Sequence, residues 1–501
     1  MKVNIYWSRR DFRLHDNPAL YACVKSCEEY GAYFLPIFIL EDYMTEAKPD
    51  FQFGYPSRYF LAKCLPEFAK KFERFEIVKG KGVQTILHIK ESIEKENKNC
   101  ELKVFVNEDV YIDFYKQIKK IKSQDVHIEV FKDQLTISKE TKSGVGNQYS
   151  VFTPFKKAVW EEFLKAEVFP IVNLKHLKYF KEKVGAIKVE NNFQSIWHTF
   201  SKNRFLKVAG HEINIDTELG FMPDFESIDN FYYTESECLE RFKKYLEVDL
   251  QGYKEYRDSL EKDRTSKMSL GLAWGLVSAR TLKQKILIHF DTNFLNINWF
   301  KLSDKDAGPI HFLSELIWRE FYKYLLFHNG ELMNQEFQVK FRGNIQWVEE
   351  KEAIKRFKAW IRGETGYKVV DAAMMQLAKS GWMHNRSRMI VASILTKNLG
   401  VDWRWGQEYF RAMLLDLDEA SNNGGWQWGA SVGADPKPIR IFNPYLQAEN
   451  YDKNNVYQRK WLGEERFSLI SVPLVEHKGA RNDALRRYGL GETTDKNVRD
   501  Y

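Results

Sequence analysis

The sequence VNIYWSRRDFRLHDNPAL (3–20) contains the start of a strand–loop–helix unit. Its β-branched and aromatic run VNIYW is typical of a buried strand. Asn17 followed by Pro18 has the residue types of a helix N-cap and a first helical position, so a helix is expected to begin directly after the loop WSRRDFRLHD. No GxGxxG motif follows the strand, and the usual dinucleotide-binding fingerprint is therefore absent.

The same alternation of short apolar runs and helical stretches continues through the first 135 residues. The further runs expected to be strands are AYFLPIFIL (32–40), FEIVKG (75–80), KVFVN (103–107) and HIEVF (127–131). Repeated βα units indicate a doubly wound parallel sheet with helices on both faces. We therefore predict an N-terminal Rossmann-like α/β domain over residues 1–135.

The pattern changes twice in the rest of the chain. Residues 136–215 mix polar and basic runs with short apolar pieces of no sustained period, and we interpret them as a long interdomain connector. Later segments such as SELIWREFYKYLLF (314–327) and GYKVVDAAMMQLAKSG (366–381) repeat apolar residues at helical spacing. Residues 216–501 are therefore predicted to form an all-helical domain.

Composition narrows the class of protein. With 501 residues the chain is long enough for two or three hydrophobic cores. Its five scattered cysteines include no CxxC pair, so we expect no disulfide framework, no metal site and a reducing compartment. No apolar run of about 18 residues is present, so no membrane span is expected. The net charge of +7 is compatible with a local nucleic-acid patch, and 14 Trp suggest a use for aromatic rings.

Two clusters in the helical part have the residue types of binding sites. In TSKMS (265–269), hydroxyl residues gather where a helix is expected to begin, and free backbone N–H groups there suit a phosphate; a simple helix cap is the alternative. Glu315 and Trp318 are spaced i,i+3 and so share one helix face, where a carboxylate could bond a base edge while the ring stacks on it. A solvated Glu beside a core Trp is the alternative.

The stretch from Trp382 to Trp428 is the third candidate. Arg388 lies in an apolar helical segment and needs a carboxylate partner if it is buried, for which Asp416 and Asp418 are the candidates. An ion pair of this kind between helices is more often architecture than catalysis. The run Asn422–Gly425 pairs two Asn with two Gly, and we expect it to break a helix and let the backbone approach a flat ligand.

These blocks resemble the DNA photolyase and cryptochrome family. In family order they are Tyr253 with Arg257-Asp258, TSKMS (265–269), ELIWREFY (315–322), GETGYKVVDAAM (363–374), GWMHNRSRM (381–389), NNGGWQW (422–428) and DPKPIRIFNP (435–444). The similarity extends from WSRRDFRLHDNPAL near the start to VEHKGARNDAL (475–485), which is nearly the whole chain.

The resemblance implies a bent FAD in the helical domain, working as the fully reduced anion that absorbs blue light and passes an electron to the substrate. Arg388 and Asp416 should form an ion pair beside its isoalloxazine, and Asn422 should face N5. The protein would supply orientation, dryness and electrostatics. The residues expected to bind this cofactor are Tyr253, Thr265, Ser266, Lys267, Met268, Ser269, Trp382, Asn385, Arg388, Asp416, Asp418 and Asn422.

The resemblance also implies a substrate, a cyclobutane pyrimidine dimer flipped out of DNA. The residues expected to bind it are Arg257, Glu315, Trp318, Asn385, Arg386, Met389 and Trp428. Glu315 and Asn422 are expected to be catalytic, together with Trp347, Trp403 and Trp426 as an electron relay; core packing is the alternative for these rings. Trp405 is a further ring that the family pattern does not require.

Three positions favour repair of this dimer over other activities of the family. The (6-4) photolyases and animal cryptochromes have a histidine pair where this chain has only His384, with Asn385 and Met389 beside it. Plant cryptochromes usually have Asp, and insect ones Cys, where this chain has Asn422. A cryptochrome-like photoreceptor, a (6-4) photolyase and an unrelated nucleotide-binding protein fused to a helical module are the alternatives.

The resemblance leaves a second chromophore open. An antenna in the α/β domain would be methenyltetrahydrofolate, 8-hydroxy-deazaflavin, a flavin or nothing, and candidates such as Asn107 and Glu108 do not discriminate among them. We expect a monomer with UV-damaged DNA as its partner and no obligate protein partner. In a bacterium its place would be the cytoplasm, around the nucleoid.

Overall fold

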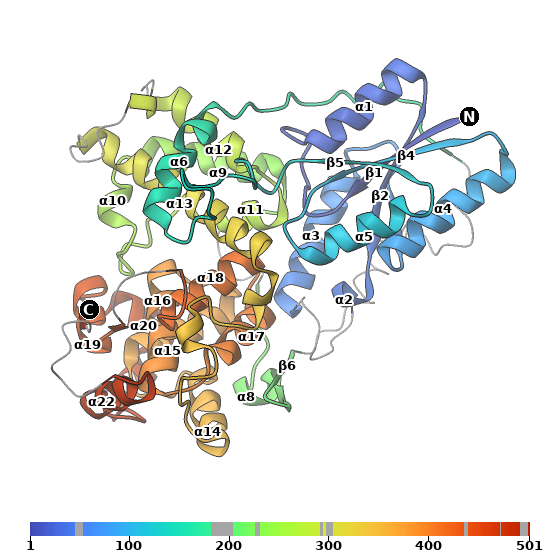
Figure 1. Cartoon of the computed structure of the whole chain (residues 1–501). Helices are drawn as coiled ribbons and strands as arrows, with labels where there is room; N and C mark the ends of the chain where they lie inside the picture. Colours follow the sequence, from blue (N-terminus) through green and yellow to red (C-terminus); the bar gives the residue numbers. More distant parts are fainter. Residues whose placement is uncertain are drawn as a thin grey trace.

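The computed structural model describes residues 1–45, 54–181, 204–225, 231–290, 294–296, 304–434, 439–470, 472–490 and 499–500. An α/β domain formed by the N-terminal part of the chain lies beside a larger assembly of helices (Figure 1). The segment after the last strand of the α/β domain returns to the helical side, where α6 lies against α13 (Figure 1).

The α/β domain is built on one sheet of five parallel strands in the order β3-β2-β1-β4-β5. The strands are β1 (Lys2–Ser8), β2 (Tyr33–Leu40), β3 (Glu76–Lys79), β4 (Glu101–Asn107) and β5 (His127–Phe131). Each lies on a run predicted from the sequence, and the order is that of a doubly wound sheet. Both predictions are confirmed.

Helices cover both faces of this sheet. Successive side chains of β1 point to opposite faces and therefore enter two different hydrophobic cores. Tyr6 packs with α1 (Pro18–Tyr30) and α3 (Tyr55–Ala69), whereas Ile5 packs with α4 (Gly82–Glu96) and α5 (Ile112–Lys122). A short helix, α2 (Asp42–Thr45), follows β2. Helix α1 starts as predicted, since the Asn17 side chain accepts from the Leu20 N–H and Pro18 is its first residue.

The described part of residues 136–215 is more ordered than a plain connector. It contains α6 (Phe152–Lys165), an antiparallel pair β6 (Phe205–Val208) and β7 (His211–Asn214), and the start of α8 (Ile215–Leu219). Helix α6 buries Phe155, Trp160 and Phe163 against the helical domain. The interpretation that this segment has no sustained apolar period is therefore wrong for α6. The boundaries of the domains stay predictions.

The rest of the chain is mainly helical. Its helices are α9 (Glu235–Val248), α10 (Tyr253–Tyr256), α11 (Ser269–Trp274), α12 (Ala279–Phe290), α13 (Asp304–His328), α14 (Glu350–Ile361), α15 (Lys368–Ser380), α16 (Asn385–Ser393), α17 (Trp403–Met413), α18 (Glu419–Gly429), α19 (Pro444–Tyr451), α20 (Val456–Leu462), α21 (Glu464–Leu469) and α22 (His477–Arg487). Single turns lie at η1 (Phe294–Asn296), η2 (Gly330–Met333), η3 (Val339–Phe341) and η4 (Ile394–Asn398). The prediction of a helical domain is confirmed, apart from the two-residue pair β8 (Arg440–Ile441) with β9 (Arg499–Asp500).

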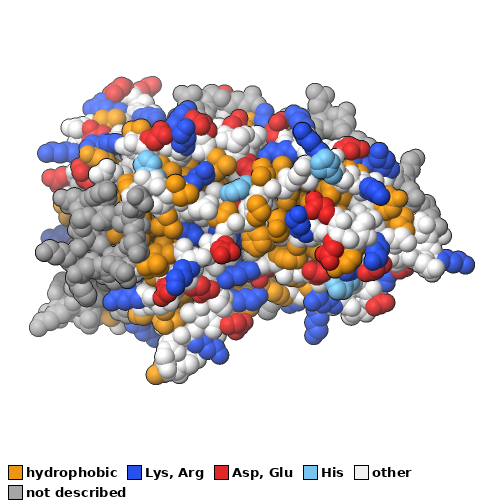
Figure 2. Space-filling model, turned by 90° about the horizontal axis from the view of Figure 1, so that it is seen from above, with side chains coloured by type: hydrophobic (Ala, Val, Ile, Leu, Met, Phe, Trp, Pro, Cys, Tyr) orange, Lys and Arg blue, Asp and Glu red, His pale blue; other side chains and the backbone are white. Residues whose placement is uncertain are grey.

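Charges of both signs are interspersed on the face of the molecule in Figure 2, and hydrophobic side chains lie between them. A surface of this kind agrees with the modest net charge of +7. Attraction of a polyanion to this face would therefore depend on particular side chains and not on a large positive field.

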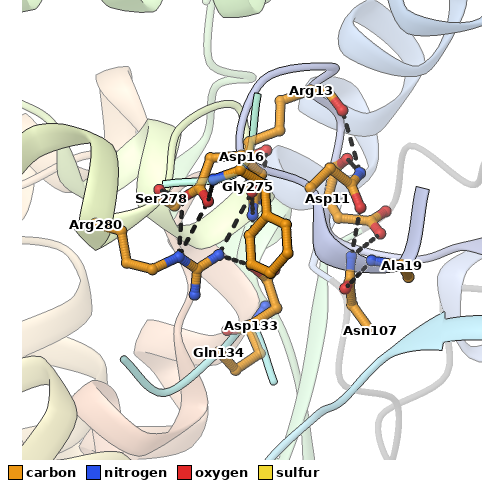
Figure 3. A network of polar contacts seen from close by, with 12 residues as sticks. Asp11, Arg13, Asp16, Ala19, Asn107, Asp133, Gln134, Gly275, Ser278 and Arg280 are labelled. Carbon is orange, nitrogen blue, oxygen red and sulfur yellow. Dashed lines mark hydrogen bonds and ion pairs between the residues drawn. The ribbon is translucent and has the colours of Figure 1, made fainter. Parts of the chain in front are cut away.

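A buried polar network ties the loop after β1 to the helical domain (Figure 3). Asp133 accepts from Arg13 at 2.5 Å and from Arg280 at 2.8 Å, and Arg280 Nε lies 3.0 Å from an Asp16 oxygen. The Ser278 hydroxyl donates to Asp16 as well. Burial by itself raises the pKa of Asp133, but the two guanidinium groups lower it, and the net shift is downward. The network therefore holds ionised groups away from water, and removing one partner would leave the others unpaired.

We expect Arg280→Met to lower the free energy of unfolding by about 3–5 kcal/mol, because Asp16 and Asp133 lose a cation in a dry site. Denaturant unfolding followed by circular dichroism measures this loss. The control is Lys25→Met, which removes an exposed ion pair with Glu28 and should change the free energy little. Equal small losses for both variants would show that the network does not hold the domains together.

Candidate functional site

A turn of acidic residues between α17 and α18 is held in place from two directions. Backbone carbonyls of residues 414–417 accept from Ser57 at 2.9 Å, from Trp274 at 2.7 Å and from Arg10 at 2.9 Å. The N–H that begins α18 donates to the Tyr111 hydroxyl at 3.1 Å. Ser57, Arg10 and Tyr111 belong to the α/β domain and Trp274 to α11, so both parts of the chain fix this turn.

Within this turn Asp416 pairs with Arg388 of α16. The Arg388 Nη2 atom lies 3.0 and 2.8 Å from the two Asp416 oxygens, and Nε donates to the Met383 carbonyl at 2.9 Å. The Asp416 side chain is fully buried, while a quarter of the Arg388 side chain is exposed. The sequence left Asp416 and Asp418 open as partners for Arg388, and the structure selects Asp416.

Asp418 has a different task. One of its oxygens accepts from the Ser421 N–H at 2.9 Å and caps α18, and the other lies 2.7 Å from Lys323 Nζ. Burial by itself raises the pKa of Asp418, but the positive charges of Lys323 and Arg319 lower it by more. The pKa of Asp418 therefore lies well below the ordinary value. Asp418 is thus a charged cap that fixes the start of the helix bearing Asn422.

The run Asn422–Gly425 lies inside α18, so the prediction that it breaks a helix is wrong. Tertiary contacts compensate for its weak helix propensity. Asn423 donates to Gln407 at 2.7 Å, and a Cβ on Gly424 would come within 2.1 Å of the Tyr322 ring. Gly424 is therefore required for the contact between α18 and α13, whereas a Cβ on Gly425 would meet no atom within 4 Å.

Asn422 has a buried acceptor without a donor. Its Nδ2 donates to the Gln407 carbonyl at 3.2 Å, but its Oδ1 has no hydrogen-bond partner and the residue is only 8% exposed. A buried acceptor left unpaired costs about 1–3 kcal/mol. An N–H donor from a bound ligand would remove that cost.

A large cavity of about 1460 Å³ lies next to the segment 262–267. Its walls include Thr265, Ser266, Lys267 and Trp382. The Lys267 ammonium group lies 2.9 Å from Asp263 and 5.0 Å from the centroid of the Trp382 ring. This volume is ample for a ligand as large as a dinucleotide.

Three further predicted cofactor residues, Ser269, Met268 and Tyr253, are not part of the cavity wall. Ser269 begins α11 and accepts from Trp382 Nε1 at 3.4 Å. Met268 is 2% exposed, and its sulfur contacts Cys238, so its side chain belongs to the core. Tyr253 packs edge-on against Phe312 at 5.3 Å. Of these three residues, Ser269 has the hydroxyl group and the place at a helix start that suit contact with a phosphate.

The predicted cofactor residues form two groups that meet at residues 381–383. Thr265, Ser266 and Lys267 lie on the cavity wall, whereas Arg388, Asp416 and Asn422 do not line it. The Gly381 carbonyl accepts from the Leu415 N–H at 2.8 Å, and the Met383 carbonyl accepts from Arg388. The backbone around Trp382 therefore connects the cavity to the acidic turn.

Most of the predicted substrate residues lie on α13 and α16, while Arg257 directly follows α10 and Trp428 lies on α18. Arg257 pairs with Glu315 at 2.5 Å, and Arg386 pairs with Asp258 at 2.9 Å. Both Arg257 and Glu315 are partly exposed. These two arginines, both predicted to bind the substrate, thus have carboxylate partners on the protein, which a DNA phosphate would have to displace or share.

Flat side chains accompany these charges. Trp318 stacks on Phe152 with ring centroids 3.6 Å apart. Trp428 is partly exposed, contacts Phe442 edge-on at 6.2 Å and lies under the Arg440 guanidinium. Asn385 is exposed and its Nδ2 lies 3.7 Å from the Met389 sulfur, so these two side chains share one face of α16.

The three tryptophans predicted to relay electrons have distinct surroundings. Trp403 is fully buried and donates to Glu336 at 3.2 Å, while Trp426 is buried and packs over Gly406 of α17. Trp347 is partly buried and contacts Tyr488 edge-on at 6.1 Å. Burial of the first two and partial exposure of the third is the order that a path to the surface requires.

A second series of rings leaves Trp426 in another direction. Trp426 lies 6.0 Å from Trp360, Trp360 lies 5.7 Å from Phe357, and Phe357 lies 5.4 Å from Trp405. Trp405, which the family pattern does not require, is thereby connected to one of the predicted relay residues.

Sequence reasoning missed three contributors. Gln407 contacts both Asn422 and Asn423, Phe152 stacks on Trp318, and His384 caps α16 by accepting from the Arg386 N–H at 3.1 Å. Burial lowers the pKa of His384 to about 4, so its ring is neutral. Only His384 had a local signal, its place directly before a helical pattern; the others act across long separations in sequence.

A smaller cavity of about 380 Å³ opens at the carboxyl ends of β1 and β2. Trp7, Phe38 and Trp274 contribute aromatic walls, and Arg9 Nη1 and Gln117 Oε1 are buried polar atoms without a partner. The antenna candidates Asn107 and Glu108 are not on its wall. Asn107 donates instead to Asp11 and Asn17, and Glu108 pairs with Lys139.

Within the described ranges, no helix is both long and apolar enough to cross a membrane. The same part of the chain has no group of three or more His, Cys, Asp or Glu residues placed to hold a metal ion.

Comparison with known proteins identifies the class. Residues 4–173 match the family model described as DNA photolyase, and residues 312–469 match the FAD binding domain of DNA photolyase. The fold is thus that of a flavin-binding protein with an α/β and a helical domain. The chain belongs to the DNA photolyase and cryptochrome family.

The similar proteins cover almost the whole chain. The deoxyribodipyrimidine photo-lyase of Vibrio cholerae is 30% identical over 512 residues, which is 97% of this chain and 99% of that protein. The corresponding Synechococcus protein is 31% identical over 92% of this chain and 88% of its own length. A class III photolyase structure from Agrobacterium tumefaciens has a TM-score of 0.77 at 28% identity, covering 98% and 97% of the two chains. A Synechocystis cryptochrome structure at 24% identity, with 97% and 99% coverage and a TM-score of 0.77, shares the fold.

Proposed function

We propose that this protein uses light and a reduced FAD to split cyclobutane pyrimidine dimers in DNA. The observation that supports this most is the buried, unpaired Oδ1 of Asn422 on the helix that follows the Arg388–Asp416 pair. Relatives that align with nearly the whole chain are named deoxyribodipyrimidine photo-lyase. The cofactor class follows from the family, and the lesion is our inference.

The residues present fit a bound FAD. Asn422 Oδ1 would accept from a flavin N–H, and the Asp416 carboxylate, fixed by Arg388, would face the same ring system. Thr265 and Ser266 on the cavity wall would hold the phosphates. When bound, reduced FAD supplies the light absorption and the electron that opens the cyclobutane ring.

The protein supplies position and dryness. Trp382 is 7% exposed and Met383 fully buried, so the segment that joins the cavity to Asp416 excludes water. On the substrate side, Trp318 and Trp428 offer flat faces for flipped pyrimidines, and stacking is worth about 1–3 kcal/mol per base. Glu315 supplies a carboxylate next to Trp318 for the polar edge of the dimer, and Arg386 would contact a flanking phosphate.

The residues around the lesion favour the cyclobutane dimer over the (6-4) photoproduct. Asn385 and Met389 share one exposed or partly exposed face of α16, and neither is the histidine that the (6-4) resemblance would require. The only neighbouring histidine, His384, is 1% exposed and occupied as a helix cap. Among the described residues, the face of α16 that would meet the lesion therefore has no exposed imidazole to act as a proton donor.

A repair assay with two matched oligonucleotides tests this proposal. Reduced, FAD-loaded protein under blue light should restore the thymines of an oligonucleotide with one cyclobutane dimer and should leave the same sequence with a (6-4) photoproduct unchanged. Chromatography of the products measures both reactions, with samples kept in the dark as the control. Binding without repair of either lesion would favour a photoreceptor, and repair of only the second lesion would reverse the assignment.

We further propose that Trp426, Trp403 and Trp347 carry electrons between the surface and the cofactor region. Trp403→Phe should slow the light-driven reduction of bound FAD, because a buried link of the path is lost, while repair by protein reduced beforehand stays at the wild-type rate. Trp405→Phe is the matched control and should leave both rates unchanged. Slowing by Trp405→Phe alone would assign the path to the series through Trp360 and Phe357.

For the second chromophore we propose the cavity at the carboxyl ends of β1 and β2. Its aromatic walls suit a flat heterocycle, and Arg9 Nη1 and Gln117 Oε1 offer one unpaired donor and one unpaired acceptor to its edges. An archaeal photolyase from Sulfolobus tokodaii, 23% identical, was solved with two FAD molecules. A flavin-sized ring is therefore one chemical class that we propose for this cavity.

A further inference from the structure

The ring of Trp318 has one face covered by Phe152. The two ring centroids are 3.6 Å apart and the planes differ by only 10°. Most aromatic pairs in proteins have centroids 4.5–7 Å apart, so this contact is closer and more parallel than usual. Phe152 comes from the first position of α6, far from α13 in the sequence. Only the other face of Trp318 remains for a base.

We infer that Phe152 is a positioning residue of the lesion site, which holds the Trp318 ring at the angle in which its free face stacks on a flipped pyrimidine. This inference rests on the proposed function, since it assigns Phe152 a part in binding the same dimer. It adds to the site a residue from the segment between the two domains.

The helix that bears Phe152 is firmly packed, so we do not expect Phe152 to leave its place when substrate binds. One turn later in α6, Phe155 lies 5.0 Å from Phe321 and 5.1 Å from Tyr324, both on α13. The Tyr149 N–H donates to the Tyr324 hydroxyl at 3.2 Å, which fixes the chain just before α6. Phe152 itself is 9% exposed. The backbone that carries Phe152 is therefore fixed against α13, and its ring is held in a buried position.

The remaining neighbours of Trp318 leave its ring dependent on Phe152. Tyr322 meets it at 5.5 Å with a 37° tilt, and Phe321 meets it edge-on at 5.8 Å. Neither covers a face as Phe152 does. Without Phe152 the indole would gain rotational freedom, and binding a base would have to order it again. A preformed ring avoids that entropic cost.

The polar part of the site is fixed to the same framework. Glu315 lies three residues before Trp318 on α13, so the two side chains share a face of the helix. The Glu315 carboxylate is held by Arg257 at 2.5 Å. A base on the free face of Trp318 would thus have a carboxylate within the reach of its polar edge.

A double-mutant cycle tests the inference. Full-length, FAD-loaded protein is titrated in the dark with a duplex containing one thymine cyclobutane dimer and with the undamaged duplex. We expect Phe152→Ala to weaken binding of the damaged duplex about three- to tenfold, the cost of ordering one large side chain again, with no change for undamaged DNA. On a Trp318→Ala background, Phe152→Ala should have no further effect. On a Trp428→Ala background its effect should persist in full.

Two further variants separate positioning from folding. Phe152→Leu keeps the apolar volume but removes the flat ring and should bind damaged DNA as weakly as Phe152→Ala, whereas Phe152→Tyr should bind like wild type. Tighter binding by Phe152→Ala would show that Phe152 occupies the place of the base. An equal loss in the presence and absence of Trp318 would also overturn the inference. If the wild-type protein did not prefer damaged DNA, the proposed function would fail and the role of Phe152 with it, whereas a preference for damaged DNA that Phe152→Ala leaves unchanged would overturn the role of Phe152 alone.

Discussion

The buried ion pair between Arg388 and Asp416 is the contact on which the candidate cofactor site depends. A fully buried carboxylate is stable only with a partner, so Arg388 fixes where Asp416 can lie. Arg10 and Ser57 of the α/β domain hold the turn that bears Asp416 by hydrogen bonds to its backbone carbonyls. The N-terminal domain is therefore part of the scaffold of the helical site.

This dependence explains why the two domains are joined by buried charges. The network of Arg13, Asp16, Asp133 and Arg280 fixes the loop after β1, and the same loop supplies Arg10 to the acidic turn. Displacement of one domain would move both contacts together. A chromophore in the α/β cavity would thus be held at a constant distance from the helical site, as energy transfer between two chromophores requires.

Features with local causes could be predicted from the sequence, and those with tertiary causes could not. The N-cap at Asn17 and the need of Arg388 for a carboxylate are local statements, and the structure confirms both. The helix through Asn422–Gly425 could not be foreseen, because Gln407 of α17 and Tyr322 of α13 contact it from other elements. The contact of Phe152 with Trp318 likewise exists only after α6 packs on α13.

The affinity for FAD tests most directly whether the acidic turn is the cofactor site. Asp416→Asn keeps the size of the side chain but removes its charge, and Asp402→Asn makes the same change at the cap of α17, where Asn also serves as an N-cap. We expect Asp416→Asn to weaken FAD binding about tenfold or more, the cost of one charge-assisted contact, and Asp402→Asn to leave it unchanged. Titration of the apoprotein by flavin fluorescence measures both. Wild-type affinity in Asp416→Asn, with the fold retained by circular dichroism, would contradict the account.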